Sequence, residues 1–421
     1  MTHSYLNYFS AGLDDLETQS LRRKLKISES PSGPLMMIDG QEMLTFCSND
    51  YLGLANHPKL SQAIQQGLEL YGSGSGASHM ISGHHLAHDQ LEKALAQTQA
   101  SYIPKVKALF FSTGYMANLA AITALTAPVA TDKNQNQMAK GQINSEGPLI
   151  FSEELNHASL IDGVRLAQKQ NRAIAKVFPH QDLSTLEKLL AQSVSTPSPI
   201  KLIVTDAVFS MDGDLAKLTE LLKLAHQYDA LLLIDDAHGF GVLGQHGHGA
   251  LEAFQMKYSD EAASRIIYIG TLGKAAGLSG AFIAAHETLI EWIMQKGRSY
   301  IYTTASPPAI AHGLLKSLEL LSDQSHRQSL QRNISYWKNH LNLKKWSLMP
   351  SETAIQPIVI GSNEAALKVA QALYQKKIWV PAIRPPTVPQ GTARLRITLS
   401  ASHTTEQIAQ LIEALQEIEH E

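Results

Sequence analysis

The sequence predicts an α/β fold with two domains, a large domain with a mostly parallel sheet and a smaller C-terminal α/β domain. Short apolar strands alternate with helical segments, polar residues gather where those strands end, and the last 120 or so residues repeat the alternation with strands and helices of their own. A chain of 421 residues is long enough for both domains.

The clearest unit lies between residues 200 and 240. Residues 200–206 (IKLIVTD) read as a buried strand, residues 215–228 as a helix with leucines at helical spacing, and residues 231–239 (LLLIDDAHG) as a second buried strand. Strand, helix and strand in about forty residues form a βαβ unit, and such sheets bind ligands at the carboxyl ends of their strands. The polar residues at or just after those ends are Asp206, Ser210, Asp235, Asp236 and His238.

The same alternation continues on both sides of this unit. Further strands are predicted at 107–111, 265–270 and 277–285, and a turn at 112–118 leads into a helix. The C-terminal elements are strands at 354–361, 378–383 and 393–400 and helices at 364–377 and 404–418. Residues 131–147 are polar and aperiodic, which predicts a surface insertion. The expected divisions are an N-terminal arm packing on the small domain (1–55), a large domain (56–297) and a small domain (298–421).

Composition argues against several classes of protein. A net charge of −3 with 17% charged residues gives no electrostatic case for binding nucleic acid or a membrane surface. Cys47 has no second cysteine to pair with, which is typical of a reducing compartment. Neither a secretory signal nor an apolar run of the roughly 20 residues that span a bilayer is visible, so we expect a soluble, cytoplasmic protein.

Residues 268–280 (YIGTLGKAAGLSG) place Lys274 among small residues with no acidic neighbour. A phosphate-binding loop requires a hydroxyl residue directly after the lysine, and that position is Ala275. A lysine that forms a Schiff base with a carbonyl also needs a tight, reachable pocket. On this stretch alone, a solvated loop lysine remains the alternative.

The rest of the chain supplies the groups that pyridoxal phosphate (PLP) requires. Its aldehyde needs a lysine, its phosphate needs hydroxyls and backbone amides, and its pyridine nitrogen needs an acid that keeps it protonated. Asp235 is the candidate acid, whereas Asp236 points the other way along the strand and is expected to be structural. The full candidate set is Ser112–Tyr115, His157, Ser210, Asp235, His238, Thr271 and Lys274.

Several motifs resemble those of the α-oxoamine synthases, PLP enzymes of fold type I (aspartate aminotransferase-like) that join an amino acid to an acyl thioester and release CO2. The resemblance extends from about residue 20 to 415, and its motifs are SNDYLGL (48–54), NHASLIDG (156–163), VFSMDGD (208–214), DDAHGFGVLGQHGHG (235–249), GTLGKAAGLSG (270–280) and YTTASPP (302–308). Departures include the insertion, His248 where an arginine is common, and Ala275–Ala276 after the lysine.

The resemblance implies a role for each matching residue. Lys274 would bind the aldehyde and shuttle the α-proton, Asp235 would bind the pyridine nitrogen, and His238 the ring 3′-oxygen. His157 would stack on the ring and also touch substrate, so the implied catalytic residues are Lys274, His157, Asp235 and His238. The further cofactor contacts would be Gly114, Tyr115, Ser210, Thr271 and, from the neighbouring subunit of a homodimer, Thr303 or Thr304. Arg384 would hold the substrate carboxylate, with Thr387 and Arg22 lining the acyl site.

Residues 354–361 and 382–400 resemble the family members of the biotin pathway, which use L-alanine and a pimeloyl thioester carried on CoA or on an acyl carrier protein. Sister synthases that use glycine, making 2-amino-3-oxobutyrate or 5-aminolevulinate, are the alternative within the family. A non-catalytic regulatory relative is the alternative outside enzyme function, although the intact lysine, aspartate, histidine and arginine argue against it.

Histidines 84, 85 and 88 could suggest a metal site, because His84 and His88 are one helical turn apart. Zinc normally takes three or four protein ligands, and no cysteine or carboxylate pattern completes the set. The sequence therefore predicts no metal.

Overall fold

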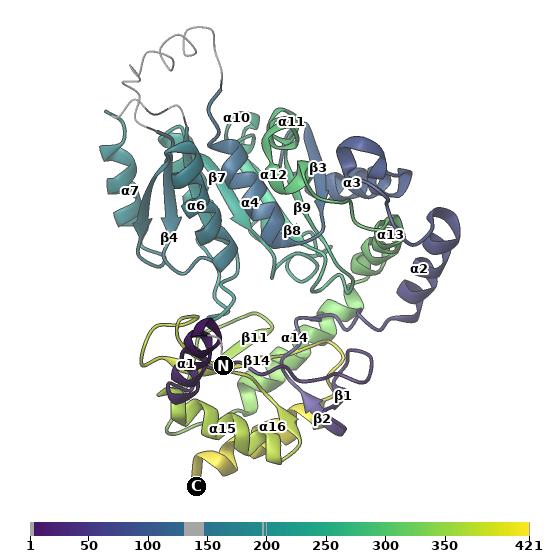
Figure 1. Ribbon diagram of the computed structural model, residues 1–421, viewed down its shortest axis with the longest axis vertical. Coiled ribbons are helices and arrows are strands. Elements are labelled where there is room, and N and C mark those ends of the chain that lie inside the picture. The colour runs from purple at the N-terminus through teal and green to yellow at the C-terminus, as the bar shows by residue number, and fades with distance from the viewer. Residues whose placement is uncertain (1–3, 130–146, 196–197, 199, 421) are drawn as a thin grey trace. The chain divides into compact units, whose positions relative to one another are not determined.

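The computed structural model describes residues 4–129, 147–195, 198 and 200–420 (Figure 1). The expected insertion at 131–147 lies outside the described residues apart from Gly147. The chain forms two compact units. The sheet unit comprises Leu54–Phe209 and Leu215–Ser325, and the terminal unit comprises Met1–Gly53, Ser210–Asp214 and His326–Glu421. The domain boundaries expected near residues 55 and 297 stay predictions.

The sheet unit is built on seven strands in the order β3-β9-β8-β7-β6-β4-β5. In that order they are β3 (Val106–Phe111), β9 (Ala281–His286), β8 (Ile266–Thr271), β7 (Leu231–Asp235), β6 (Lys201–Asp206), β4 (Leu149–Glu153) and β5 (Ile174–Phe178). Neighbours from β8 to β5 pair in parallel, and β9 runs antiparallel to both β8 and β3. The sheet is thus mostly parallel, as predicted.

Helices cover the sheet, so its central strands are buried on both faces rather than on alternate residues. Every residue of β4 and β8 is buried, and α4 and α6 lie side by side over the sheet in Figure 1. Ala117, Ile122 and Leu160 from these two helices pack with Leu202, Leu233 and Ile267 in one hydrophobic core. The helical segments of this unit are α2 (Pro58–Tyr71), η1 (His79–Gly83), α3 (Leu86–Gln99), α4 (Gly114–Leu125), α6 (Ala158–Asn171), α7 (Leu183–Gln192), α8 (Leu218–Gln227), α9 (Ala250–Ala253), α10 (Asp260–Ala263), α11 (Glu287–Lys296), α12 (Arg298–Ile301) and α13 (Pro308–Ser322).

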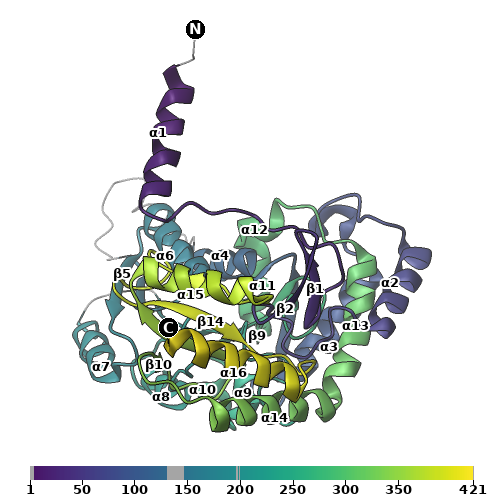
Figure 2. The ribbon, with the colours of Figure 1, turned by 90° about the horizontal axis from the view of Figure 1, so that it is seen from below.

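The terminal unit contains two small sheets. One has the antiparallel order β10-β11-β14-β13, and in the other β2 pairs antiparallel with β1 and parallel with β12. Helix α15 packs on β11 and β14 and contacts α16. Figure 2 shows α15 and α16 on either side of β14 in that view. The strands are β1 (Leu35–Ile38), β2 (Gln41–Thr45), β10 (Ser347–Leu348), β11 (Ile355–Gly361), β12 (Ile378–Trp379), β13 (Ala382–Ile383) and β14 (Ala393–Thr398), and the helices are α1 (Ser4–Thr18), α14 (Gln324–His340, which begins in the sheet unit), α15 (Asn363–Gln375) and α16 (Thr405–His420).

One predicted strand is wrong in form. Residues 378–383 make two short strands in different sheets instead of a single strand, because Ile378–Trp379 pairs with β2 whereas Ala382–Ile383 pairs with β14. Pro381, which lies between them, has no backbone N–H to give to a ladder. The strand predicted at 277–285 begins later, at Ala281, because residues 277–280 form the turn before it.

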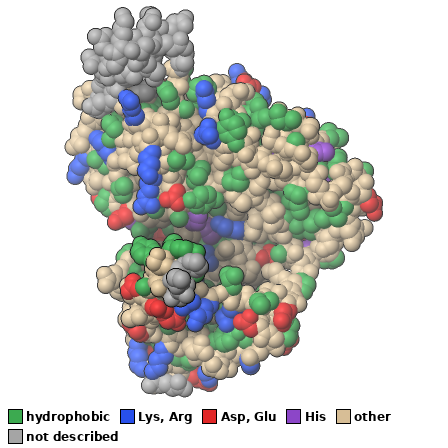
Figure 3. Space-filling model, viewed as in Figure 1, with side chains coloured by type: hydrophobic (Ala, Val, Ile, Leu, Met, Phe, Trp, Pro, Cys, Tyr) green, Lys and Arg blue, Asp and Glu red, His purple; other side chains and the backbone are tan. Residues whose placement is uncertain are grey.

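Helix α1 is amphipathic and has no buried residue. Its apolar side chains are exposed, among them Tyr8 at 76% and Phe9 at 64%, and Figure 3 shows hydrophobic side chains on its surface. Among the described helices, none has the length and apolar character needed to span a bilayer. The expected cytoplasmic location stays a prediction.

Candidate active site

The predicted acids lie at the carboxyl edge of the parallel strands. Asp206 and Asp235 are the last residues of β6 and β7 and are partners across the ladder. Thr271 is the last residue of β8, the next strand along. Parallel neighbours end at the same edge, so these three side chains share the edge where α/β sheets bind ligands.

Asp235 is held by two donors that fix its carboxylate. The side-chain amide of Asn118 donates to Asp235 Oδ2 at 2.6 Å, and the backbone N–H of Ala237 donates to Oδ1 at 3.0 Å. Asp235 is 4% exposed and Asn118 only 1%. A buried carboxylate needs such partners, and these leave its position well defined.

His157, the N-cap of α6, belongs to the same network. Asn118 also donates to Ser159 Oγ at 2.8 Å, and Ser159 Oγ lies 2.7 Å from His157 Nδ1. The backbone N–H of Ser159 donates to the same Nδ1 at 3.2 Å, so Nδ1 acts as an acceptor and the ring proton of the neutral imidazole sits on Nε2. Burial lowers the pKa of His157, which favours this neutral form.

Asp206 is a second carboxyl group beside Asp235. Burial, followed by the charge of Asp235, raises the pKa of Asp206 well above its ordinary value. Its Oδ2 accepts the backbone N–H of His157 at 2.6 Å. The raised pKa favours the neutral form of Asp206, which reduces the repulsion between the two neighbouring carboxyl groups.

Asp236 faces a different environment, as expected of a structural residue. Its Oδ2 accepts the backbone N–H of Ala250 at 2.6 Å and the hydroxyl of Tyr268 at 2.7 Å. Burial raises the pKa of Asp236 to about 7. These bonds tie the loop after β7 back to β8.

Lys274 lies in the short loop between the antiparallel strands β8 and β9. Backbone bonds from Leu272 to Gly280 and from Leu278 to Leu272 close this loop, at 2.8 and 3.1 Å. Lys274 Nζ lies 2.8 Å from Nε2 of His238, which follows β7 and is 8% exposed. The structure therefore brings the predicted lysine and one predicted ring-binding histidine into direct contact.

The start of α4 presents the backbone amides expected to hold a phosphate. Thr113 is the N-cap, and its side chain accepts the N–H of Met116 at 3.3 Å. Gly114 and Tyr115 are the first residues of the helix, where backbone N–H groups lack helical partners. The Tyr115 hydroxyl donates to Asp162 at 2.6 Å, so Tyr115 would contribute its backbone rather than its phenol. Thr271 donates to the Gly280 carbonyl at 3.1 Å.

The two candidate threonines from the neighbouring subunit differ in exposure. Thr303 is half-buried, whereas Thr304 is exposed and forms an isolated backbone bridge with Ser78. Their contact with a phosphate in a second chain stays a prediction.

The remaining predicted residues, Arg22, Ser210, Arg384 and Thr387, belong to the terminal unit. The Ser210 carbonyl accepts a hydrogen bond from Arg396 at 2.7 Å. Arg22 is exposed and lies 3.6 Å from Glu17, and Thr387 is also exposed. Their predicted contacts with cofactor or substrate stay predictions.

Arg384 is half-buried, and its guanidinium donates to the backbone carbonyl of Ser20. Burial lowers the pKa of Arg384, and the nearby positive charge of Arg23 lowers it further. Two guanidinium groups close enough to repel one another form a region where an anion would be stabilised.

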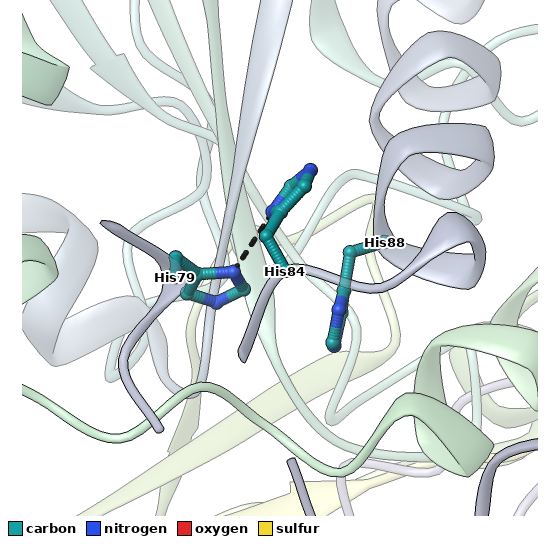
Figure 4. A group of neighbouring side chains, drawn as sticks. All are labelled: His79, His84 and His88. Atoms are coloured by element: carbon teal, nitrogen blue, oxygen red, sulfur yellow. Dashed lines mark hydrogen bonds between the residues drawn. The ribbon is translucent and has the colours of Figure 1, made fainter. Parts of the chain in front are cut away.

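His84 and His88, two of the three histidines that suggested a metal, form a group with His79 (Figure 4). His79 Nδ1 and His84 Nδ1 lie 3.0 Å apart, and burial lowers the pKa of His79 to about 3 and of His88 to about 4. His88 already uses both ring nitrogens: Nδ1 accepts the N–H of His85 at 3.0 Å, and Nε2 lies 2.9 Å from the Ser306 carbonyl. A metal bound by all three rings would have to break one of these bonds.

The arrangement around Lys274 fits PLP on chemical grounds. An amine, a buried carboxylate with fixed geometry, a neutral histidine and a helix N-terminus are the groups that the aldehyde, the pyridine nitrogen, the ring face and the phosphate require. Sequence reasoning missed Asn118 and Ser159, which orient Asp235 and His157. A polar side chain in the otherwise apolar first turns of α4 was the one available signal for Asn118.

Comparison with known proteins gives the family. The family model "Aminotransferase class I and II" matches residues 41–415. The 8-amino-7-oxononanoate synthase of Janthinobacterium sp. (strain Marseille) is 52% identical over 423 residues, covering 99% of this chain and 100% of the relative. The corresponding synthase of Polaromonas naphthalenivorans (strain CJ2) is 50% identical, covering 97% of each chain.

Solved structures give the same result for the fold. The 8-amino-7-oxononanoate synthase from Francisella tularensis superposes with a TM-score of 0.71 at 31% identity, covering 89% of this chain and 97% of that one. A lysine-to-alanine variant of a serine palmitoyltransferase from S. paucimobilis, with a bound PLP–myriocin aldimine, superposes with a TM-score of 0.84 at 27% identity, covering 99% of this chain and 98% of that one. Fold type I, the mostly parallel sheet and the PLP cofactor are thereby confirmed.

Proposed function

Because this chain belongs to the class I and II aminotransferase family and, within it, to the α-oxoamine synthases, we propose that it condenses L-alanine with a pimeloyl thioester. The products are 8-amino-7-oxononanoate, CO2 and the free thiol of the carrier, which is a step of biotin biosynthesis. The proposal rests on relatives that bear this name and share about half of their residues with this chain over nearly its whole length.

The residues of the sheet unit would divide the work as follows. PLP, when bound, supplies an electron sink for the electron pair left at the α-carbon of the amino acid. Lys274 would hold the aldehyde carbon through its amine and, when the substrate amine takes its place on that carbon, the freed Nζ would take and return the α-proton. Asp235, fixed by Asn118, would keep the proton on the pyridine nitrogen. His238, at 2.8 Å from Lys274, would bind the 3′-oxygen, and His157 would stack on the ring.

The phosphate would be held by the amides of Gly114 and Tyr115, by Thr271 and by Ser210. Thr303 or Thr304 of a second subunit would complete the site, which makes the enzyme a homodimer. Exposed apolar side chains close in sequence to the two partners of the Ser78–Thr304 bridge support such an interface. They are Met80 at 42%, Ile81 at 81%, Leu86 at 60% and Tyr302 at 71% exposure.

Arg384 would hold the carboxylate of L-alanine, with Arg22 and Thr387 along the acyl site. This role is supported by the lowered pKa of Arg384, which results from burial and from the positive charge of the neighbouring Arg23. A carboxylate between two guanidinium groups relieves that repulsion and accepts planar, paired hydrogen bonds.

Steady-state assays of the purified chain with PLP test the proposal. L-alanine, glycine and L-serine are each paired with pimeloyl-CoA and with the pimeloyl acyl carrier protein. We expect CO2 release and 8-amino-7-oxononanoate formation with L-alanine. Glycine is also paired with acetyl-CoA and with succinyl-CoA, and turnover of these pairs without turnover of L-alanine would assign the chain to a sister synthase. No turnover, together with no visible absorbance band that borohydride removes, would indicate a non-catalytic relative.

A further inference from the structure

A second group of histidines lies outside the catalytic set, in the loop between β7 and α9. Its members are His246 and His248, and the carboxylate of Glu252 on α9 lies against both. Glu252 is 4% exposed and accepts the backbone N–H groups of His246 and His248, each at 3.1 Å. A buried acid thus fixes the backbone of both histidines.

The same carboxylate also sets the tautomer of His246. Nδ1 of His246 lies 2.6 Å from Glu252 Oε1. A carboxylate oxygen in this contact accepts the proton carried by Nδ1, which leaves the lone pair of the imidazole on Nε2.

This is the arrangement that metal-binding histidines use, in which one ring nitrogen donates to a carboxylate and the other binds the ion. The side chain of His246 is 56% exposed, so a hydrated ion can reach it. The rings of His246 and His248 lie 5.6 Å apart between centroids, inclined by 33°, and the candidate ligand atoms of the group all lie within 4.8 Å of one another.

The backbone of His248 is anchored from a second side. Its carbonyl accepts the side-chain amide of Gln99 at 2.9 Å, which ties the loop to α3. Glu252 and Gln99 thus hold the backbone of both histidines in place, and a bound zinc ion would lie roughly 2.0–2.1 Å from each ligating nitrogen.

We propose that His246 and His248 bind a divalent transition-metal ion of the zinc class, with Glu252 as the carboxylate that orients His246. Imidazole ligands suit Zn²⁺, Ni²⁺ and Cu²⁺. Two protein ligands are fewer than the three or four that zinc normally takes, so water would fill the remaining positions and we expect an exchangeable ion that binds more weakly than in a structural zinc site. The His79–His84–His88 group is a poorer candidate, because both ring nitrogens of His88 are already engaged.

The test is calorimetric titration of Zn²⁺ into the full-length chain loaded with PLP. We expect one ion per chain in the wild type. His246→Ala and His248→Arg should each weaken binding by at least tenfold, since a guanidinium cannot act as a ligand. Glu252→Gln should weaken it by about 10–100-fold, the usual effect of losing an orienting carboxylate. His84→Asn is the matched control in the other histidine group and should bind Zn²⁺ as the wild type does.

Thermal unfolding of each variant without zinc checks that it remains folded. If Glu252→Gln does not fold, the two histidine variants still test the site independently of it. The proposal is overturned if the wild type binds no Zn²⁺, if either histidine variant binds it as tightly as the wild type, or if His84→Asn abolishes binding.

Discussion

Replacing Asn118 by alanine tests whether the active-site acid is positioned by this amide. The change removes two donors at once, one to the Asp235 carboxylate at 2.6 Å and one to the Ser159 hydroxyl at 2.8 Å. A hydrogen bond to a charged group contributes about 1.5–3 kcal/mol and a neutral one about 0.5–1.5 kcal/mol. The free energy of unfolding should therefore fall by roughly 2–4 kcal/mol.

A matched control lies at the far end of the same helix pair. The side-chain amide of Asn171 on α6 also donates two hydrogen bonds at the end of α4, to the carbonyl of Thr123 at 2.7 Å and to the hydroxyl of the C-cap residue Thr126 at 2.9 Å. Asn171→Ala should lower stability without affecting the cofactor. Asn118→Ala should in addition weaken PLP binding by roughly 10–100-fold, because Asp235 loses the donor that aims it at the pyridine nitrogen.

The assays are urea unfolding and fluorescence titration with PLP, followed by kcat at saturating PLP. If Asn118→Ala binds PLP with the wild-type dissociation constant and turns over at the wild-type rate, Asn118 does not position Asp235. If both asparagine variants weaken PLP binding equally, the effect comes from the helix pair as a whole.

The other predictions concern single groups. Lys274→Ala should abolish turnover and the borohydride-sensitive absorbance band, because it removes both the covalent anchor and a proton shuttle worth about 10²–10⁴-fold; turnover within tenfold of wild type contradicts the assignment. Asp235→Asn should fold yet lose most activity, measured as kcat with L-alanine, because an amide cannot keep the pyridine nitrogen protonated. Arg384→Lys should weaken L-alanine binding by roughly 1.5–3 kcal/mol, read from a spectral titration, and an unaltered dissociation constant would place the carboxylate site elsewhere. Burial lowers the pKa of His403 to about 4. As the pH falls below about 6.5, the imidazole of residue 403 therefore takes up a proton in the unfolded state before it does so in the folded state, which destabilises the folded protein. The free energy of unfolding, measured from pH 7 to 4, should drop by on the order of 3 kcal/mol more in the wild type than in His403→Gln.

The sequence predicted the parts of the fold that depend on local pattern. The strands at 201–206, 231–235 and 266–271 are apolar and buried, and their ends carry the acids and the lysine loop as expected. The parallel arrangement follows from the helices between them. Strand pairs that depend on partners far along the chain could not be predicted in this way, which is why residues 378–383 were expected as one strand and not as members of two sheets.

The same distinction applies to the site. Lys274 and Asp235 stand out because each is a charged residue in an apolar or small-residue segment. Asn118 does not, because its bonds to Asp235 and Ser159 join residues 117 and 41 positions apart in sequence, which no local spacing encodes. Conversely, the histidines at 84 and 88 have a suggestive spacing, yet His88 bonds to Ser306, far outside the motif.

The antiparallel strand β9 has a consequence for how the site assembles during folding. Lys274 lies in a hairpin between β8 and β9, so its position needs only the closure of a short loop, which costs little chain entropy. Asp235 reaches the same edge only when β7 docks on β8, and Asn118 only when α4 packs across the sheet. Contacts that close longer loops form more slowly. Recovery of PLP binding during refolding should therefore report on these long-range steps, and lag behind signals from the β8–β9 hairpin.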